Sequence, residues 1–295
     1  MKTTDKPLSE TIRRLRCEVE PERPVKPTDW EALNAAAGGR LSPEVEALYR
    51  DHDGWGRHLT YRLLPARDAL DAQEEYADKL PPDGFLLFED DFMLYYAGIY
   101  LDGPLRGKIF ILSDETVTWS PTHRSLESFL THLLEPVGED VMDDYPLPAR
   151  AEPEAVQGLL RLAQERPEER VQWLWAAMAM VPRHDARQLI DFLDDPDPEV
   201  QEQAAYLLGE AGCADAVAAL RQRFPGLEFQ PGVQALLSIG RVGTPEAQDA
   251  LLAHVGKLPP EYTPFLGRAL ECCGFEITIQ DGWAYRNGGD WVRLP

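Results

Sequence analysis

Apolar positions divide the chain into a part with strand patterns and a part with helix patterns. Before residue 137, short apolar runs rich in aromatic and β-branched residues alternate with turn residues, which is typical of antiparallel strands. Beyond residue 155, apolar residues recur at helical spacing up to the C-terminal segment 275–295. The pattern therefore predicts two domains, a number that the length of 295 residues allows.

Two helices are predicted to open the first domain. In the first, over 28–38, Thr28 is the expected N-cap and Glu31 completes a capping box. Ser42 is the expected N-cap of the second, with Pro43 at its first helical position.

Strands follow, the first of them before a helix and the others in a meander that a second helix closes. The predicted helices cover 66–80 and 125–137, and Ser125 is the expected N-cap of the second. The order helix, helix, strands, helix predicts an α+β domain with an antiparallel meander sheet and flanking helices. The predicted strands are 59–65, 85–88, 92–101, 107–112 and, as an extension, 116–119.

The second domain contains an internal repeat with a period of 31 residues. Repeats of this length, built from paired helices, stack into an all-α solenoid. The Trp- and Gly-rich end of the chain, 275–295, is predicted to form a short hairpin that caps the last repeat. The residues that recur at this period are Leu189, Leu220 and Leu251, Gly209 and Gly240, Gly212 and Gly243, and Ala216 and Ala247.

These patterns predict five segments. They are an arm or linker at 1–27, an α+β domain at 28–137, an acidic Pro-rich linker at 138–154, helical repeats at 155–274 and the hairpin or cap at 275–295.

The net charge of -22 bears on the kind of partner. An acidic chain is repelled by nucleic-acid phosphates and attracted to basic proteins. No apolar run reaches the length of a membrane span, and the first residues lack the apolar region of a signal peptide, so a cytoplasmic protein is expected. The four cysteines are scattered without a CxxC pair, which argues against a disulfide framework or a zinc ribbon.

Three consecutive acids between apolar runs, residues 89–91, are the most conspicuous candidate site. They could be a metal site, a catalytic carboxylate cluster or the tip of a hairpin. Neighbouring acids at a turn point in different directions, so we expect a hydrated hairpin tip. The open alternative is a protein-binding edge with aromatic anchors, in which neutralising all three acids slows association and leaves the fold intact. The predicted partner contacts are Glu89, Asp90, Asp91, Phe92, Tyr95, Asp51, Asp53 and Trp55.

Other candidate sites have a structural interpretation. His52 and His58 lie near Asp51 and Asp53 in "DHDGWGRH", which we interpret as a helix C-cap and a loop rather than a metal site. The acids of 194–199 lack the glycine and the final glutamate of a calcium loop, so Asp197 is interpreted as the N-cap of a repeat helix. No glycine-rich phosphate loop is present. We therefore expect no catalytic residues, no metal and no cofactor.

Residues 28–137 resemble the SUKH superfamily, which includes bacterial toxin-immunity proteins. The resemblance rests on Leu41-Ser42-Pro43, on Asp53-Gly54, and on "FLLFEDDFMLYYAGIYLDG", "GKIFIL" and "SLESFLTHL". Ser42 is an insertion relative to the family's Leu-Pro pattern.

Residues 155–274 resemble HEAT repeats, most clearly in "DPDPEVQEQAAYLLGEAG". The second unit departs from the pattern, because Gln230-Pro231-Gly232-Val233 replaces its Asp-containing opening.

The SUKH resemblance implies a non-enzymatic immunity protein that neutralises a bacterial toxin by occluding it. The expected partner is a basic toxin domain such as a nuclease, and no nucleic acid, membrane or small-molecule substrate is expected. The alternative is a regulatory scaffold that binds its partner through the helical repeats.

Overall fold

The computed structural model shows two compact units. The first comprises residues 1–148 and 153–161, and the second comprises 149–152 and 162–295. Of the predicted arm at 1–27 and linker at 138–154, most residues lie outside the described ones. The residues described are 11, 14, 24–55, 60–90, 94–113, 118–134, 151–255, 257–278, 283–286 and 291–293.

The first unit begins with the helices α2 (Pro27–Ala36) and α3 (Pro43–Asp51). Ser42 caps α3 as predicted, because its Oγ accepts a hydrogen bond from the backbone N–H of Val45 at 3.4 Å. The predicted cap of the first helix is wrong. Pro27 occupies the first helical position and Lys26 is the N-cap, since proline fixes a helical φ and has no N–H that needs a cap.

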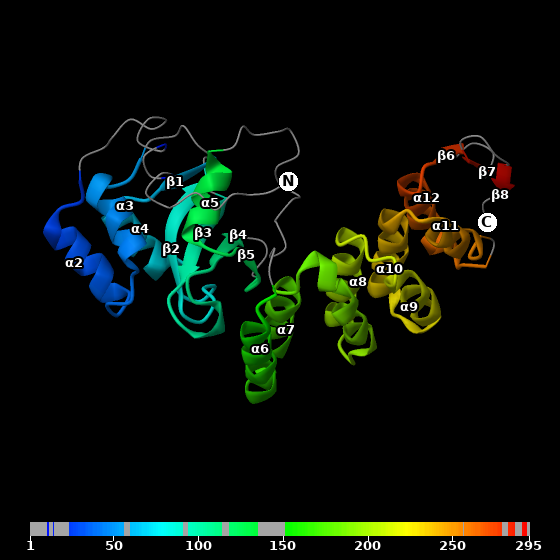
Figure 1. The fold of residues 1–295 in the computed structure, drawn as a ribbon, viewed down its shortest axis with the longest axis horizontal. Helices are drawn as coiled ribbons and strands as arrows, with labels where there is room; N and C mark the ends of the chain where they lie inside the picture. Colours follow the sequence, from blue (N-terminus) through cyan, green and yellow to red (C-terminus); the bar gives the residue numbers. More distant parts are fainter. Residues whose placement is uncertain are drawn as a thin grey trace. The chain divides into compact units, whose positions relative to one another are not determined.

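A five-stranded antiparallel sheet follows, with strands in the order β1-β2-β3-β4-β5 (Figure 1). The predicted meander is therefore confirmed. A strand over 116–119 is not, because Thr118 and Trp119 lie outside any strand. The strands are β1 (Tyr61–Leu63), β2 (Gly84–Asp90), β3 (Tyr95–Tyr100), β4 (Ile109–Ser113) and β5 (Pro121–His123), with a short 3-10 turn η1 (Gly103–Leu105) before β4.

The helix α4 (Ala66–Glu75) is tied to β2 by one side chain. The Gln73 amide donates a hydrogen bond to the Leu86 carbonyl and accepts one from the Leu86 N–H, each at 3.1 Å. These bonds satisfy the β2 backbone where its register with β3 shifts, between Leu86 and Phe88.

The helix α5 (Leu126–Leu133) packs on the sheet through Phe129. The Phe129 ring lies 5.6 Å from the ring of Tyr61 on β1 and 4.9 Å from that of Phe88 on β2. Ser125 and Ser128 form the capping box that starts the helix, so the predicted cap is confirmed.

The second unit is built from helices that form two layers. One layer contains η3, α9 and α11, and the other contains α8, α10 and α12, which are the second helices of successive pairs. Figure 1 shows them following one another along the chain. Most of α6 (Pro153–Glu165) is assigned to the first unit, and its last residues to the second. The other helices of the second unit are η2 (Pro167–Glu169), α7 (Arg170–Ala179), η3 (Arg183–Asp194), α8 (Pro198–Glu210), α9 (Ala216–Arg223), η4 (Phe224–Gly226), α10 (Phe229–Val242), α11 (Pro245–Leu252), η5 (Pro260–Tyr262) and α12 (Thr263–Cys272).

The repeat of 31 residues places equivalent residues in equivalent environments. Leu189, Leu220 and Leu251 are all fully buried, in η3, α9 and α11. Gly212 and Gly243 both follow a second helix and adopt positive φ angles of 63° and 66°, which suit glycine. The predicted helical repeat is therefore confirmed over these residues.

The C-terminal segment forms three strands rather than the predicted two-stranded hairpin. These strands, β6 (Phe275–Thr278), β7 (Trp283–Arg286) and β8 (Trp291–Arg293), make an antiparallel sheet in that order. β6 contacts α12, the last helix of the repeats.

Candidate partner-binding surfaces

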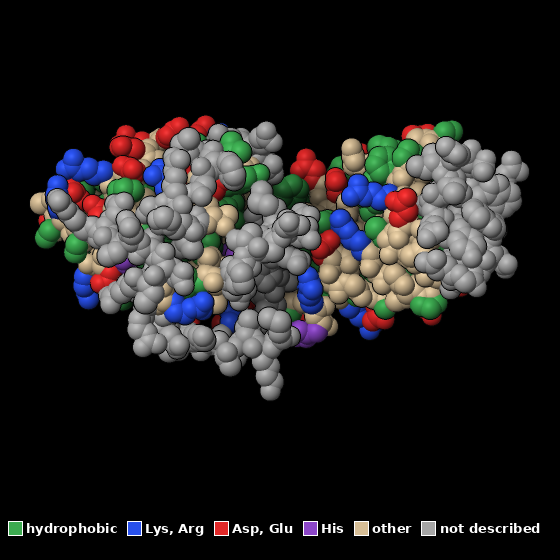
Figure 2. Space-filling view, turned by 90° about the horizontal axis from the view of Figure 1, so that it is seen from above, with side chains coloured by type: hydrophobic (Ala, Val, Ile, Leu, Met, Phe, Trp, Pro, Cys, Tyr) green, Lys and Arg blue, Asp and Glu red, His purple; other side chains and the backbone are tan. Residues whose placement is uncertain are grey.

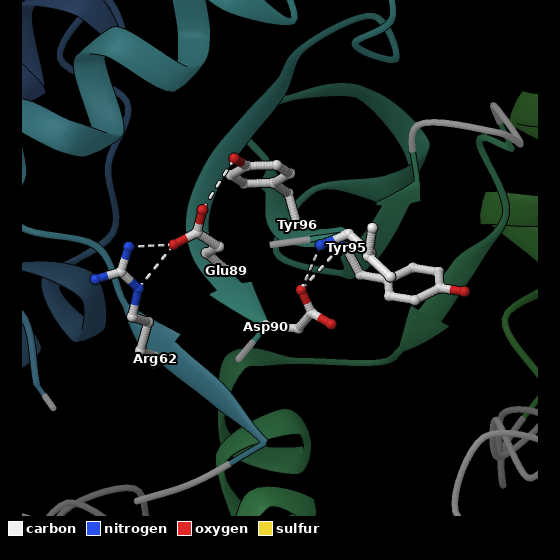
Figure 3. Close-up of polar contacts among 6 residues, drawn as sticks. Arg62, Glu89, Asp90, Tyr95 and Tyr96 are labelled. Atoms are coloured by element: carbon white, nitrogen blue, oxygen red, sulfur yellow. Dashed lines mark hydrogen bonds and ion pairs between the residues drawn. The ribbon is translucent and has the colours of Figure 1, made fainter. Parts of the chain in front are cut away.

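Glu89 lies inside the sheet, between two strands that both bind it (Figure 3). Its position on β2 is directly opposite Arg62 on β1 and Tyr96 on β3. Arg62 donates from Nε at 2.7 Å and also from Nη2, and the Tyr96 hydroxyl donates at 3.0 Å. The residue is only 5% exposed. Its carboxylate therefore links β2 to both neighbouring strands.

Asp90, the last residue of β2, binds the backbone at the start of β3. Its Oδ1 accepts hydrogen bonds from the backbone N–H groups of Leu94 at 2.8 Å and Tyr95 at 3.0 Å, and the residue is 5% exposed. The predicted hydrated tip is thus wrong for both Glu89 and Asp90. Their neighbours Asp91 and Phe92 lie outside the described residues.

Trp55 and Asp53 also have structural roles. Trp55 is 2% exposed, and its Nε1 donates to the Tyr61 carbonyl at 3.1 Å. Asp53 accepts a hydrogen bond from the Ala66 N–H, at the start of α4, at 2.9 Å. Burial excludes Trp55 from a surface contact, so that prediction is wrong. A partner contact by Asp51 or Tyr95, which are both half-buried, stays a prediction.

Charged groups at the turn before α8 pair with one another. Asp194 accepts two hydrogen bonds of 2.6 Å from Arg223, whose guanidinium lowers the pKa of Asp194. Asp195 is paired with Arg170, and Asp197 caps α8 by accepting from the Glu199 N–H at 2.9 Å. The structural interpretation of this acidic turn is confirmed. Among the residues that the structure describes, no three His, Cys, Asp or Glu side chains are grouped to hold a metal ion.

The outward side of α8 carries polar and aromatic side chains at helical spacing. Glu199, Glu202, Tyr206 and Glu210 are exposed or half-buried there, whereas the intervening apolar residues are buried. Trp175 on α7 donates from Nε1 to the Glu199 carbonyl at 3.3 Å. We call these side chains and Arg241 of α10 the charged helix face.

Arg241 joins this face to the next helix of the same layer. Its Nη1 lies 3.0 Å from an oxygen of Glu210, and its guanidinium lies 5.2 Å from the centre of the Tyr206 ring. The face therefore extends from α7 across α8 to α10. The sequence analysis did not predict these residues as a binding surface. The signal that could have found them is the helical spacing of polar residues in the repeat, which lie on the side of α8 that faces away from the core.

Glu202 is a half-buried carboxyl of the charged helix face. Partial burial, and then the charge of Glu199, raise its pKa. A cation supplied from outside would relieve the repulsion between the two carboxylates. In Figure 2, acidic and basic side chains are interspersed on the visible face, so the net charge is not gathered into one acidic surface there.

Comparison with known proteins bears on the helical unit. Residues 186–263 match the family profile of HEAT repeats. HEAT repeats generally mediate protein–protein interaction, and the match covers η3 to η5, which include most of the charged helix face. The helical-repeat prediction is therefore supported over residues 186–263.

No curated protein and no solved structure matches the chain. No family match or relative supports the SUKH resemblance of residues 28–137. The toxin-immunity function that this resemblance implied therefore has no support. None of the described helices is both long enough and apolar enough to cross a membrane.

Proposed function

We propose that this protein is a non-enzymatic scaffold that binds a basic protein partner through its HEAT repeats. The observation that carries the proposal is the charged helix face, which lies on the second helices of the repeats. Aromatic side chains such as Trp175 and Tyr206 supply contact area there, and Glu199 and Glu202 attract a cation.

The packing of the layer makes this face rigid. A Cβ on Gly209 of α8 would lie 2.7 Å from the Cβ of Ser238 on α10, so the two helices are in close contact. A surface that does not have to reorganise keeps more of its interaction free energy on binding.

The test is to find the partner by cross-linking and then to measure its affinity with purified proteins. Benzoylphenylalanine in place of Trp175 would capture the partner in cells, and mass spectrometry would identify it. We expect the double substitution Glu199→Lys with Glu202→Lys to weaken binding by about tenfold or more, because it reverses two charges that meet the partner.

The matched control reverses two acids with the same spacing on the other layer. Glu246 and Asp249 are exposed on α11. The substitutions Glu246→Lys and Asp249→Lys should leave the affinity unchanged. Equal loss from both double variants would contradict the proposal, because it would show a response to net charge alone.

A further inference from the structure

A group of aromatic side chains lies partly exposed where two helices of the repeats begin. Phe229, the first residue of α10, is 41% exposed, and Leu94 is the other exposed large apolar side chain among the described residues. The Phe229 ring centre lies 5.1 Å from that of Tyr262 and 6.0 Å from that of Phe265. We call Phe229, Tyr262 and Phe265 the aromatic patch.

Packing against neighbouring residues fixes the position of Tyr262 in the aromatic patch. Tyr262 contacts the buried ring of Phe224, with 5.5 Å between the ring centres. A Cβ on Gly232 would lie 2.8 Å from the Tyr262 hydroxyl oxygen, so glycine at this position leaves room for the tyrosine. The rings form a fixed platform, and binding to it would order few additional side chains.

The repeat itself does not require these aromatic residues. Phe229 is 31 positions after Pro198, and Phe265 is 31 positions after Gln234, so other repeats hold proline or glutamine at the equivalent places. Packing of the repeat does not explain an exposed phenylalanine at this position. Exposed apolar side chains without a packing role are typical of functional sites.

Acidic residues flank the patch on the side of the turns. Glu228 and Glu261 directly precede Phe229 and Tyr262, and both are exposed. Within the described part of the chain no ion pair engages either carboxylate, and the Glu228 side chain makes no cap hydrogen bond to α10. Glu261 adds to the effect of burial in raising the pKa of Tyr262, so its charge lies close to the ring. The nearest basic residue along α12 is Arg268, one turn beyond Phe265.

We infer that the aromatic patch binds a segment of a protein partner in which a large apolar side chain is flanked by Lys or Arg. The apolar side chain would pack on Phe229 and Phe265, and the basic residues would meet Glu228 and Glu261. The residues that dominate the binding energy of protein interfaces are often aromatic, and charged residues are typical of the rim around them. The inference rests on the proposed scaffold function and adds a contact that is separate from the charged helix face.

The test uses the full-length protein and short fluorescein-labelled peptides. One peptide has a central Phe flanked by Lys and Arg. A second has Glu in place of the basic residues, and a third has Ala in place of Phe. By fluorescence anisotropy, we expect the first peptide to bind at least about fivefold more tightly than the other two, because only it offers both kinds of contact.

Two variants and their controls locate the binding. Phe229→Ala, and Glu228→Lys with Glu261→Lys, should each weaken binding of the first peptide by about tenfold. Leu94→Ala and the α11 double variant Glu246→Lys with Asp249→Lys are the matched controls and should not change it. In the unmodified protein, amide hydrogen exchange at the starts of α10 and α12 should slow when the first peptide is added. This measurement locates the binding site without any substitution.

Three results would overturn the inference. They are equal binding of the three peptides, unchanged binding to Phe229→Ala, and a dimer that Phe229→Ala abolishes in sedimentation, which would make the patch an interface between two copies. These peptide results are independent of the variants Glu199→Lys and Glu202→Lys, so a failure here is distinguishable from a failure of the proposed function.

Discussion

Arg62, Glu89 and Tyr96 occupy opposed positions on three neighbouring strands and form one polar cluster. A buried carboxylate is tolerated only when its oxygens are paired, and Glu89 is bonded on both sides. Burial, followed by hydrogen bonds with Tyr76 and Glu89, raises the pKa of Tyr96, so its hydroxyl keeps the proton that it donates. The cluster thus has a structural role.

We predict that Glu89→Gln lowers the free energy of unfolding of the first unit by about 1–3 kcal/mol, because it weakens charge-assisted hydrogen bonds. This loss of stability should be smaller than the loss on breaking a fully buried ion pair, because the Arg62 side chain is 27% exposed and its guanidinium can be hydrated instead. Amide exchange of β2 and β3 measures the effect, and Glu31→Gln on the exposed side of α2 is the control. If Glu89→Gln left the exchange rates unchanged, the cluster would not stabilise the sheet.

His123 on β5 predicts how the first unit responds to acid. It is 5% exposed, and burial, then the neighbouring His132, lower its pKa to about 3. An unfolded histidine takes up a proton near pH ~6.5, whereas the folded one does not until near its lowered pKa. The contribution of His123 is therefore present above about pH 6.5 and is lost as the pH falls towards 3.

We expect His123→Gln to lose less stability than the unmodified protein between about pH 7 and about pH 5, because glutamine has no proton to gain. Urea unfolding of the first unit at both pH values measures this difference. The control is His184→Gln in the second unit, followed by urea unfolding of that unit, because the His184 side chain is 66% exposed and its replacement should not change the response to pH. Parallel losses in the unmodified protein and His123→Gln would show that other groups cause the acid sensitivity.

At the scale of the elements, glycine sets the distance between the second helices of the repeats. A Cβ on Gly209 would meet Ser238 at 2.7 Å, and one on Gly240 would meet the carbonyl oxygen of Ala269 at 2.5 Å. The same spacing thus recurs between α8 and α10 and between α10 and α12. At the next equivalent position Glu271 is exposed at the end of α12.

We predict that Gly240→Ala destabilises the second unit by about 1–3 kcal/mol, although alanine is the better helix former by about 1 kcal/mol. Gly209→Ala should also destabilise the unit, because its Cβ would lie 2.8 Å from the backbone Cα of Ser238 as well as 2.7 Å from the Ser238 Cβ. Urea unfolding measures both, with Gln222→Ala on the exposed side of α9 as the control. A stabilised Gly240→Ala would mean that the helices can separate at little cost.

For the molecule as a whole, the excess of acidic residues gives no indication of which surface binds. The charge of -22 arises from 51 acidic and 29 basic residues. Several of the acids are used inside the fold, such as Glu89, Asp90 and Asp195, and contribute little to an external field. A net charge of this sign would favour long-range attraction to a basic partner, whereas the contact that we propose depends on where Glu199 and Glu202 lie on the charged helix face.

The sequence by itself determined the elements whose cause is local. Ser42 and Ser125 each start a helix through their own hydrogen bonds, and the period of 31 residues fixed the order of the repeat helices, because both depend on neighbours along the chain. Only the tertiary structure decided the environment of Glu89 and Trp55. Strand register brings Arg62 of β1 to Glu89, and the Trp55 ring packs 5.7 Å from the ring of Phe88 on β2. Burial is a property of the packed molecule, and a run of acids does not reveal it. The charged helix face and the aromatic patch likewise exist only because separate helices are packed together.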